Sequence, residues 1–289
     1  MKPATSHAPE LHVRDRRFTR EALSHRWWMK DDPIGTAFYN ALSAALTKAE
    51  PFFIETVRKF RGTAPAELIE DITAFTTQEL LHTREHVAFN RRVDDAGYDM
   101  GPLEAAVDRR LNPIRAKPPI ASLAVTMALE HYTAIIAHEL LANPTHLEKA
   151  DPEAAAMWRW HALDEIEHKA VAYDMWLHET RDWSRGKRWW VKTKVMMLCT
   201  RNFMTDRFRG GLELLRQDGI TGPAAWARLF WFWFVRPGIM RKVWGAWLHF
   251  FAPGFHPWNH DNRAVVADAR KSIPGVPVAA AEPNGLTIA

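Results

Sequence analysis

The sequence predicts an all-α protein whose centre is a four-helix bundle. Three observations lead to this fold class. Apolar residues recur at helical spacing in several long segments, which proline, glycine and Asn-Pro signals separate. The pattern Glu-x-x-His occurs twice, at Glu79–His82 and at Glu165–His168. A lone glutamate lies in each of two further helical segments, and this inventory of two lone glutamates and two Glu-x-x-His motifs is typical of bundles that bind two metal ions.

Composition sets the scale of the fold. The chain has 289 residues, of which 47% are apolar and 25% charged, as in globular proteins with a large core. We expect one domain of about 200 residues plus an appendage. Cys199 is the only cysteine, which excludes an internal disulfide and a cysteine-based metal cluster. The N-terminus lacks the apolar run of a signal peptide, which favours a cytoplasmic protein.

The N-terminal elements are the least regular. Residues 1–17 are polar and are predicted to be a flexible tail. Residues 18–28 carry apolar and aromatic residues at helical spacing, which predicts an extra N-terminal helix. Asp32-Pro33 is a helix start signal, and a long helical pattern runs from Ile34 to Phe60.

Glu50 is the candidate metal ligand of this first long helix, in preference to Glu55 on the same segment. Pro51 follows it directly. A proline inside a helix removes a backbone hydrogen bond, so we expect the helix to kink or restart there. A restart capped by Thr47 would place Glu50 in the first turn.

The second helix is predicted over residues 65–95 and carries Glu79, His82 and His86 on one stripe. Residues 97–119 then form a long connection, with a short helix at 102–111. A bundle of this type needs one crossover connection, and this is the place for it.

Residues 121–142 form a nearly uncharged third helix with Glu130 in its middle. An isolated buried carboxylate is costly unless it is paired or bound to a metal. Asp151-Pro152 opens the fourth helix, which is predicted to run to about Thr180. The ligand order along the chain is then Glu, Glu-x-x-His, Glu, Glu-x-x-His.

The fourth helix supplies a further candidate. His161, Glu165 and His168 lie at i, i+4 and i+7, so they project from one helix face. A packed core histidine is the alternative role for His161. The predicted ligands of two metal ions are Glu50, Glu79, His82, Glu130, His161, Glu165 and His168.

Three residues are expected to support these ligands from outside. Gln78 and Asp164 each precede a ligand histidine by four residues, and metal-bound imidazoles usually donate their far nitrogen to such a partner. His86 lies one turn after His82 and is expected to have a supporting or substrate-facing role, with direct metal binding as the alternative. His131 and His138 are out of phase with Glu130 and are not expected to bind metal.

The C-terminal part has a different character. Residues 181–250 hold eight of the 14 tryptophans and 14 Lys or Arg against four Asp or Glu, a local net charge of +10. Its apolar stretches are too interrupted by charge to cross a bilayer. They predict either helices that cap the bundle and bury their tryptophans, or an interfacial membrane surface. No nucleic-acid-binding module is recognised, so no nucleic-acid partner is expected.

These observations predict that the chain divides into two helical parts and two tails. Residues 18–180 form the bundle, and residues 181–270 form a basic, tryptophan-rich helical extension packed on it. Residues 1–17 and 271–289 are expected to be flexible tails.

Several motifs resemble a bacterial family labelled "predicted metal-dependent hydrolase". The resemblance spans about residues 17–270 and is specific. Its motifs are Arg26-Trp27-Trp28 with Asp32-Pro33, the run Gln78–His86, the run Ala128–Ala134, WHALDEIEHKAV at 160–171, and the ending Pro253–Trp258.

The ligand pattern is also similar to that of di-iron arylamine N-oxygenases, which are ferritin-like enzymes with an added histidine one turn before the last Glu-x-x-His. His161 occupies that position. This second resemblance covers the four ligand helices only. It implies a ferritin-like bundle, two iron ions (or manganese, or a mixed pair), and oxygen chemistry.

We therefore expect a di-iron enzyme that activates dioxygen, with an external electron donor, to hydroxylate or N-oxygenate a small apolar or aromatic substrate. The metals would be bridged by Glu79, Glu130 or Glu165, the three expected catalytic residues, with His82, His161 and His168 as terminal ligands. The first alternative is a hydrolase that uses a metal-bound water. The second is a non-enzymatic metal-storage protein. The expected location is the cytoplasm, with peripheral contact to the inner face of the membrane through residues 181–250.

Overall fold

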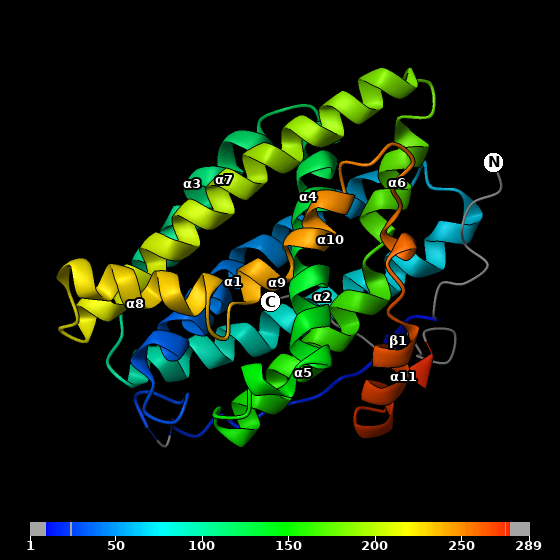
Figure 1. Ribbon diagram of the computed structural model, residues 1–289. Helices are drawn as coiled ribbons and strands as arrows, with labels where there is room; N and C mark the ends of the chain where they lie inside the picture. Colours follow the sequence, from blue (N-terminus) through cyan, green and yellow to red (C-terminus); the bar gives the residue numbers. More distant parts are fainter. Residues whose placement is uncertain (1–9, 24, 275, 278–289) are drawn as a thin grey trace.

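The chain folds almost entirely into helices, which confirms the predicted all-α class (Figure 1). The computed structural model describes residues 10–23, 25–274 and 276–277. The helices over these residues that carry the predicted ligands are α1 (Pro33–Phe60), α2 (Ala66–Asp95), α4 (Pro119–Ala142) and α5 (Pro152–His168). These four pack against one another and enclose the centre of the core, with α3 (Gly101–Arg115) in the long connection between α2 and α4. The ferritin-like topology stays a prediction.

Helix α1 runs unbroken through Pro51, so the expected restart there is wrong. Its start is fixed by Asp32, whose carboxylate accepts hydrogen bonds from the backbone N–H of Ile34 and Gly35. Thr47 does not cap a helix, and its hydroxyl donates to the carbonyl of Ala44. The helix tolerates Pro51 because α2, α3, α4 and α7 hold it on several sides, so tertiary packing outweighs one lost backbone hydrogen bond.

The predicted fourth helix is divided. Helix α5 ends at His168, and α6 (Val171–Glu179) continues after a turn. Lys169 lies in the turn with its side chain buried, and its ammonium donates to the carbonyl of His260, 2.9 Å away, and to Asn262. No proline or glycine marks this break, so the sequence pattern predicted one continuous helix here.

The N-terminal segment differs from both expectations for it. The described residues among 18–28 form no helix, because their arginines reach out to carboxylates on distant elements, as Arg26 does to Asp218. The described residues of the expected tail are also fixed. Strand β1 (His12–Val13) pairs antiparallel with β2 (Val276–Pro277), and Arg14 is buried. The expected C-terminal tail is likewise paired at 276–277, and residues 1–9 and 278–289 lie outside the described residues.

The C-terminal helices lie over the ligand helices. Helix α7 (Arg185–Gln217) is the longest helix within the described residues and packs against α1, α3 and α4 (Figure 1). It is followed by four short helices, α8 (Gly222–Phe234), α9 (Ile239–Lys242), α10 (Trp244–His249) and α11 (Arg263–Ser272), with the 3-10 turns η2 (Pro144–His146) and η3 (Pro257–Asn259) elsewhere. The division into a bundle and an extension stays a prediction.

One helix among the described residues, α4, is long and apolar enough to span a membrane by length and composition. However, 72% of its most apolar window is buried inside the protein. Glu130 lies within that helix and is itself buried. Helix α4 is therefore a core helix of this fold.

Candidate metal centre

The four ligand helices bring all seven predicted metal ligands to one buried place. None of the seven residues is more than 4% exposed. Helix α1 supplies Glu50, α2 supplies Glu79 and His82, α4 supplies Glu130, and α5 supplies His161, Glu165 and His168. The periodicity of each helix explains this placement, because each ligand lies on the stripe that faces the other three helices.

Glu165 lies at the middle of the group. Its Oε1 atom is 3.0 Å from His161 Nε2, 3.5 Å from His82 Nδ1 and 3.6 Å from His168 Nε2. Metal–ligand bonds of about 2.0–2.2 Å place two ligands of one ion at separations of this order. A carboxylate that faces three imidazoles is suited to be shared between two ions.

The ligand atoms divide into two neighbouring sets. In one set, Glu79, Glu130, Glu165 and His168 offer atoms that all lie within 4.8 Å of one another. A second set on the α1 side contains His82, His161 and Glu165, and Glu50 joins it through overlapping groups with Glu79 and His82 and with His86 and His161. Because the sets share Glu165 and Glu79, the geometry fits two adjacent cations better than one.

The hydrogen-bonding state of the ligands agrees with metal binding. Eight buried ligand atoms have no hydrogen-bond partner: Glu50 Oε1, both oxygens of Glu79, both oxygens of Glu130, Glu165 Oε2, His82 Nδ1 and His168 Nε2. Buried polar atoms are almost always satisfied, and buried carboxylates without a cation are costly. The donor set of carboxylate oxygens and imidazoles therefore fits divalent metal ions such as iron, manganese or zinc.

The pKa values of the four glutamates in the absence of metal also agree with metal binding. Burial, followed by the charges of neighbouring carboxylates, raises the pKa of Glu79 and Glu130 well above the usual range. Burial raises the pKa of Glu50 in the same way. Burial would also raise the pKa of Glu165, but His168 and His161 together hold it well below its ordinary value. Three of the four carboxylates, Glu50, Glu79 and Glu130, therefore favour the neutral form unless positive charge is added.

The ring nitrogens of His82 and His168 that face away from the other ligands each contact a residue on the opposite helix. His82 on α2 has its Nε2 atom 3.2 Å from Oδ2 of Asp164 on α5. His168 on α5 has its Nδ1 atom 3.0 Å from Oε1 of Gln78 on α2. Each outer residue thus lies four positions before one histidine and contacts the other. Spacing along one helix identified both residues but could not show this exchange.

Asp164 is itself held by Arg14, a residue that sequence reasoning assigned to a tail. The Arg14 guanidinium contacts Asp164 at 2.5 Å and Glu167 at 2.7 Å, and all three side chains are fully buried. No periodicity or motif marks Arg14, because it lies in an extended segment that only the folded chain brings to α5. His82 is affected in turn: burial lowers its pKa, but its hydrogen bond to Asp164 and the nearby carboxylate of Glu165 raise the pKa to about 10 overall.

His86 connects the centre to α1. Its Nε2 atom lies 2.7 Å from His161 Nδ1, and its Nδ1 atom lies 2.9 Å from the hydroxyl of Ser43. Ser43 in turn donates to Asn90, at 2.6 Å. His86 therefore contacts a predicted ligand directly, as expected for a supporting residue, although it also lies near enough to Glu50 to join a candidate group.

The choice between the two glutamates of α1 is clear from their positions. Glu50 is 1% exposed, and its Oε2 atom accepts a hydrogen bond of 2.9 Å from Thr83. Glu55 instead lies at the surface and pairs with Lys59 and Arg115. Only Glu50 faces the other ligands.

The centre is enclosed by aromatic rings. Phe75 packs against His168 with ring centroids 4.9 Å apart, Trp160 against His82 at 4.9 Å, and Trp158 against His86 at 5.1 Å. Leu129, which directly precedes Glu130, lines a cavity between the helices. Such walls exclude bulk water and strengthen every charge interaction inside.

That cavity has a volume of about 410 Å³ and lies between α1, α3, α4, α6 and α7. Most of its lining is apolar, including Leu46, Phe53 and Val125. Two further lining residues, Ala49 and Leu129, directly precede Glu50 and Glu130 in the chain. The cavity thus borders the two helices that carry the lone glutamates.

The comparison with known families agrees with this metal-binding geometry. The family described as "predicted metal-dependent hydrolase" matches residues 12–261, and the chain belongs to it. The resemblance of the sequence to this family is thereby confirmed. No curated protein and no solved structure matches the chain.

Proposed function

We propose that this member of the family is a metal-dependent hydrolase that holds two divalent ions and acts on a largely apolar substrate. The observation that carries the proposal is the convergence of eight unsatisfied ligand atoms from four helices on one buried place. The seven residues that would hold the ions are Glu50, Glu79, His82, Glu130, His161, Glu165 and His168. When bound, the ions would supply Lewis acidity and lower the pKa of a water molecule toward neutrality.

The surrounding residues would orient the ligands. Asp164 and Gln78 contact the outer nitrogens of His82 and His168, which fixes the tautomer that turns the other nitrogen inward. Asp164 raises the basicity of its imidazole more than the neutral amide of Gln78 does, so the two ions would differ. The His86 Nε2 to His161 Nδ1 contact provides a place to hold a proton beside the centre.

The apolar cavity is the proposed substrate site. Its volume lies within the range of small-molecule pockets, about 300–1,000 Å³. Arg207 lines it, is 3% exposed, and donates to the carbonyl of Ala41 at 2.6 Å. Lys117 also lines it, as does Arg110, which is paired with Asp206 of the same lining. Arg207 and Lys117 beside an apolar lining favour a substrate with an apolar body and a polar or anionic group.

Oxygen activation is the second candidate function. The enclosed aromatic walls and three inward imidazoles favour it, because reactive oxidants need protection from water. In that case two iron ions would supply redox chemistry with dioxygen, and an external electron donor would be needed.

Parallel reconstitution separates the candidates. Metal-depleted protein is loaded with zinc, with manganese, or with ferrous iron under nitrogen, and each form is given esters of increasing acyl length. A hydrolase releases acid with redox-inert zinc and without dioxygen. Oxygen consumption that requires iron and a reductant, with no ester cleavage by any form, would replace hydrolysis by the second candidate.

A further inference from the structure

The exposed large apolar side chains gather in one part of the molecule. Within the described residues, every such side chain lies between positions 189 and 248, on α7, α8 and α10 or directly after α8. They are Trp189, Trp190, Met197, Leu198, Trp226, Phe230, Trp231, Val235, Trp244 and Leu248, with exposures of 38–61%. Large exposed apolar patches in proteins mark binding surfaces.

These elements adjoin one another. Helix α7 contacts α8, α8 contacts α9, and α9 contacts α10 (Figure 1). Trp247 of α10 donates to the hydroxyl of Thr200 on α7 at 2.9 Å, and Trp189 of α7 donates to the carbonyl of Phe251 at 2.8 Å. The exposed side chains therefore belong to one connected layer, which we call the α7–α10 surface.

Helix α7 shows the pattern of an interfacial helix. Trp190, Lys194, Met197, Leu198 and Arg201 are exposed and lie at helical spacing, so they share one face. Tryptophans and aliphatic residues flanked by lysine and arginine on a single face are typical of helices that lie at a membrane interface.

The exposed charged side chains of this segment are basic, although Lys242 among them pairs with Glu139 of α4 at 2.9 Å. Between residues 183 and 250 the exposed ionisable side chains include ten basic ones, Arg185, Lys187, Lys194, Arg201, Arg209, Arg216, Arg228, Arg236, Arg241 and Lys242, and no Asp or Glu. The three acidic residues of this segment, Asp206, Glu213 and Asp218, are partly buried and pair with arginines. The surface therefore attracts anions.

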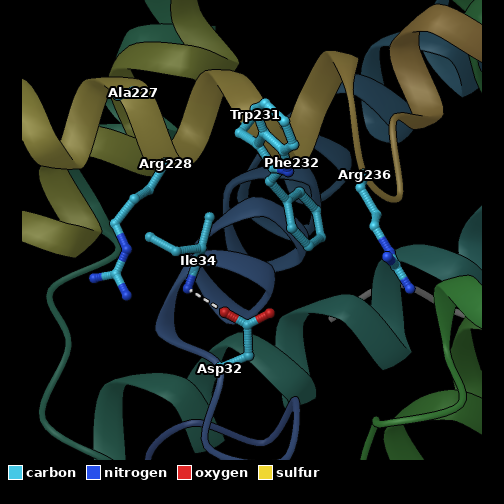
Figure 2. A pocket seen from close by; sticks show the side chains of 7 residues that line it. All are labelled: Asp32, Ile34, Ala227, Arg228, Trp231, Phe232 and Arg236. Carbon is cyan, nitrogen blue, oxygen red and sulfur yellow. Dashed lines mark hydrogen bonds between the residues drawn. The ribbon is translucent and has the colours of Figure 1, made fainter.

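A hollow of about 450 Å³ lies beside this layer, between α8 and the start of α1 (Figure 2). Arg228 and Arg236 border it, and Trp231 lies between them in the view. Asp32 also lines it, and its carboxylate caps α1. The two arginines flank an exposed indole, an arrangement that suits contact with acidic head groups at a membrane interface.

We propose that the α7–α10 surface docks on an anionic lipid bilayer. A second copy of the chain is disfavoured, because a symmetric contact would bring these basic side chains against one another. Nucleic acid would use the basic charge but would leave Met197, Leu198, Val235 and Leu248 exposed. A bilayer satisfies both groups, since indoles and aliphatic chains enter the interface while Lys and Arg meet acidic head groups.

Docking would also place the substrate cavity beside lipid. Leu198 is 45% exposed and at the same time lines the cavity. An apolar molecule could pass from the bilayer to the cavity along α7 without crossing water. The docking proposal itself does not depend on the metal centre or on the reaction, so each can fail without the other.

Co-sedimentation tests the proposal, with full-length protein and vesicles of phosphatidylcholine alone or mixed with phosphatidylglycerol, at low and high salt. The protein should bind the anionic vesicles only, and more weakly as salt screens the charges. The R228Q/R236Q variant should bind at least tenfold more weakly, since each basic residue near the surface contributes about fivefold. The W190S/W231S/W244S variant should lose most of the remaining binding at high salt.

The matched control is R91Q/R109Q, which removes the same charge from exposed positions on α2 and α3 and should bind like the parent. Circular dichroism and metal content should be unchanged in every variant, because all the altered side chains are exposed. Absence of binding to anionic vesicles at low salt overturns the proposal. The proposal also fails if R91Q/R109Q weakens vesicle binding as much as R228Q/R236Q does. If vesicle binding is absent and the tryptophan variant instead abolishes self-association or DNA binding, the surface serves that other partner.

Discussion

The Nε2 atom of His82 on α2 lies 3.2 Å from Oδ2 of Asp164 on α5. The acidic residue that precedes one Glu-x-x-His motif thus supports the histidine of the other motif. Gln78 and His168 repeat the relationship in the opposite direction. The two halves of the centre are therefore tied together outside the ligands, and the tie is a carboxylate on one side and an amide on the other.

The Asp164→Asn substitution should weaken metal binding by about 10- to 100-fold, because an amide stabilises the imidazole of His82 less than a carboxylate does. Metal titration followed by equilibrium dialysis measures the change. Asp108→Asn, at a partly exposed position on α3, is the control and should leave affinity unchanged. Equal affinity of Asp164→Asn and the parent would show that the contact has no effect on the metal.

The His161→Ala substitution should retain most bound metal but lose activity and alter the absorption spectrum of the iron-loaded, oxidised protein. The reason is that His161 is the third inward imidazole, 3.0 Å from Glu165, while six other ligands remain. Absorption spectra and metal analysis of the variant check this. A variant with the spectrum and activity of the parent would make His161 a packing residue and remove the likeness to N-oxygenases.

The Val125→Trp substitution should fill part of the cavity and raise KM for long apolar substrates more than for short ones. Val125 lines the cavity on α4 and is not a metal ligand, so metal content should not change. The measurement is KM and kcat over a series of acyl lengths, with Val125→Ala as the control that enlarges the space. A uniform fall in kcat with no dependence on length would place the substrate elsewhere.

The Arg14→Met substitution should lower the free energy of unfolding by roughly 3–5 kcal/mol, because it leaves the buried carboxylates of Asp164 and Glu167 without their shared cation. Arg270 pairs with Glu167 as well and would reduce the loss. Denaturant unfolding measures the change. Arg17→Met, at an exposed position three residues away, should be nearly neutral. Similar effects of both substitutions would contradict the structural role of Arg14.

The periodicity of apolar residues was sufficient to predict those helices whose bounds depend on local sequence. The helices containing Glu79 and Glu130 were predicted within two residues at each end, and the choice of Glu50 over Glu55 agrees with their positions. A ligand set of this kind can be predicted from sequence because a metal centre needs specific residue types at helical spacing. The right residue types rarely occur at that spacing by chance.

What the sequence could not show depends on contacts between distant segments. Helix α1 continues through Pro51 because neighbouring helices hold it. Residues 18–28 show helical spacing but are drawn into an irregular path by the ion pairs of Arg20 and Arg26. The burial of Arg14 and the exchange of outer partners need the folded chain, since no local pattern encodes either.

The measurement that tests the central claim most directly is the metal content of the purified, reconstituted chain. Elemental analysis should find two divalent ions per chain, because the ligand atoms form two sets that share Glu79 and Glu165. The Glu79→Ala, Glu165→Ala double variant removes both shared residues and should retain little or no metal. A stoichiometry near one, or a double variant with the metal content of the parent, would contradict the two-metal centre.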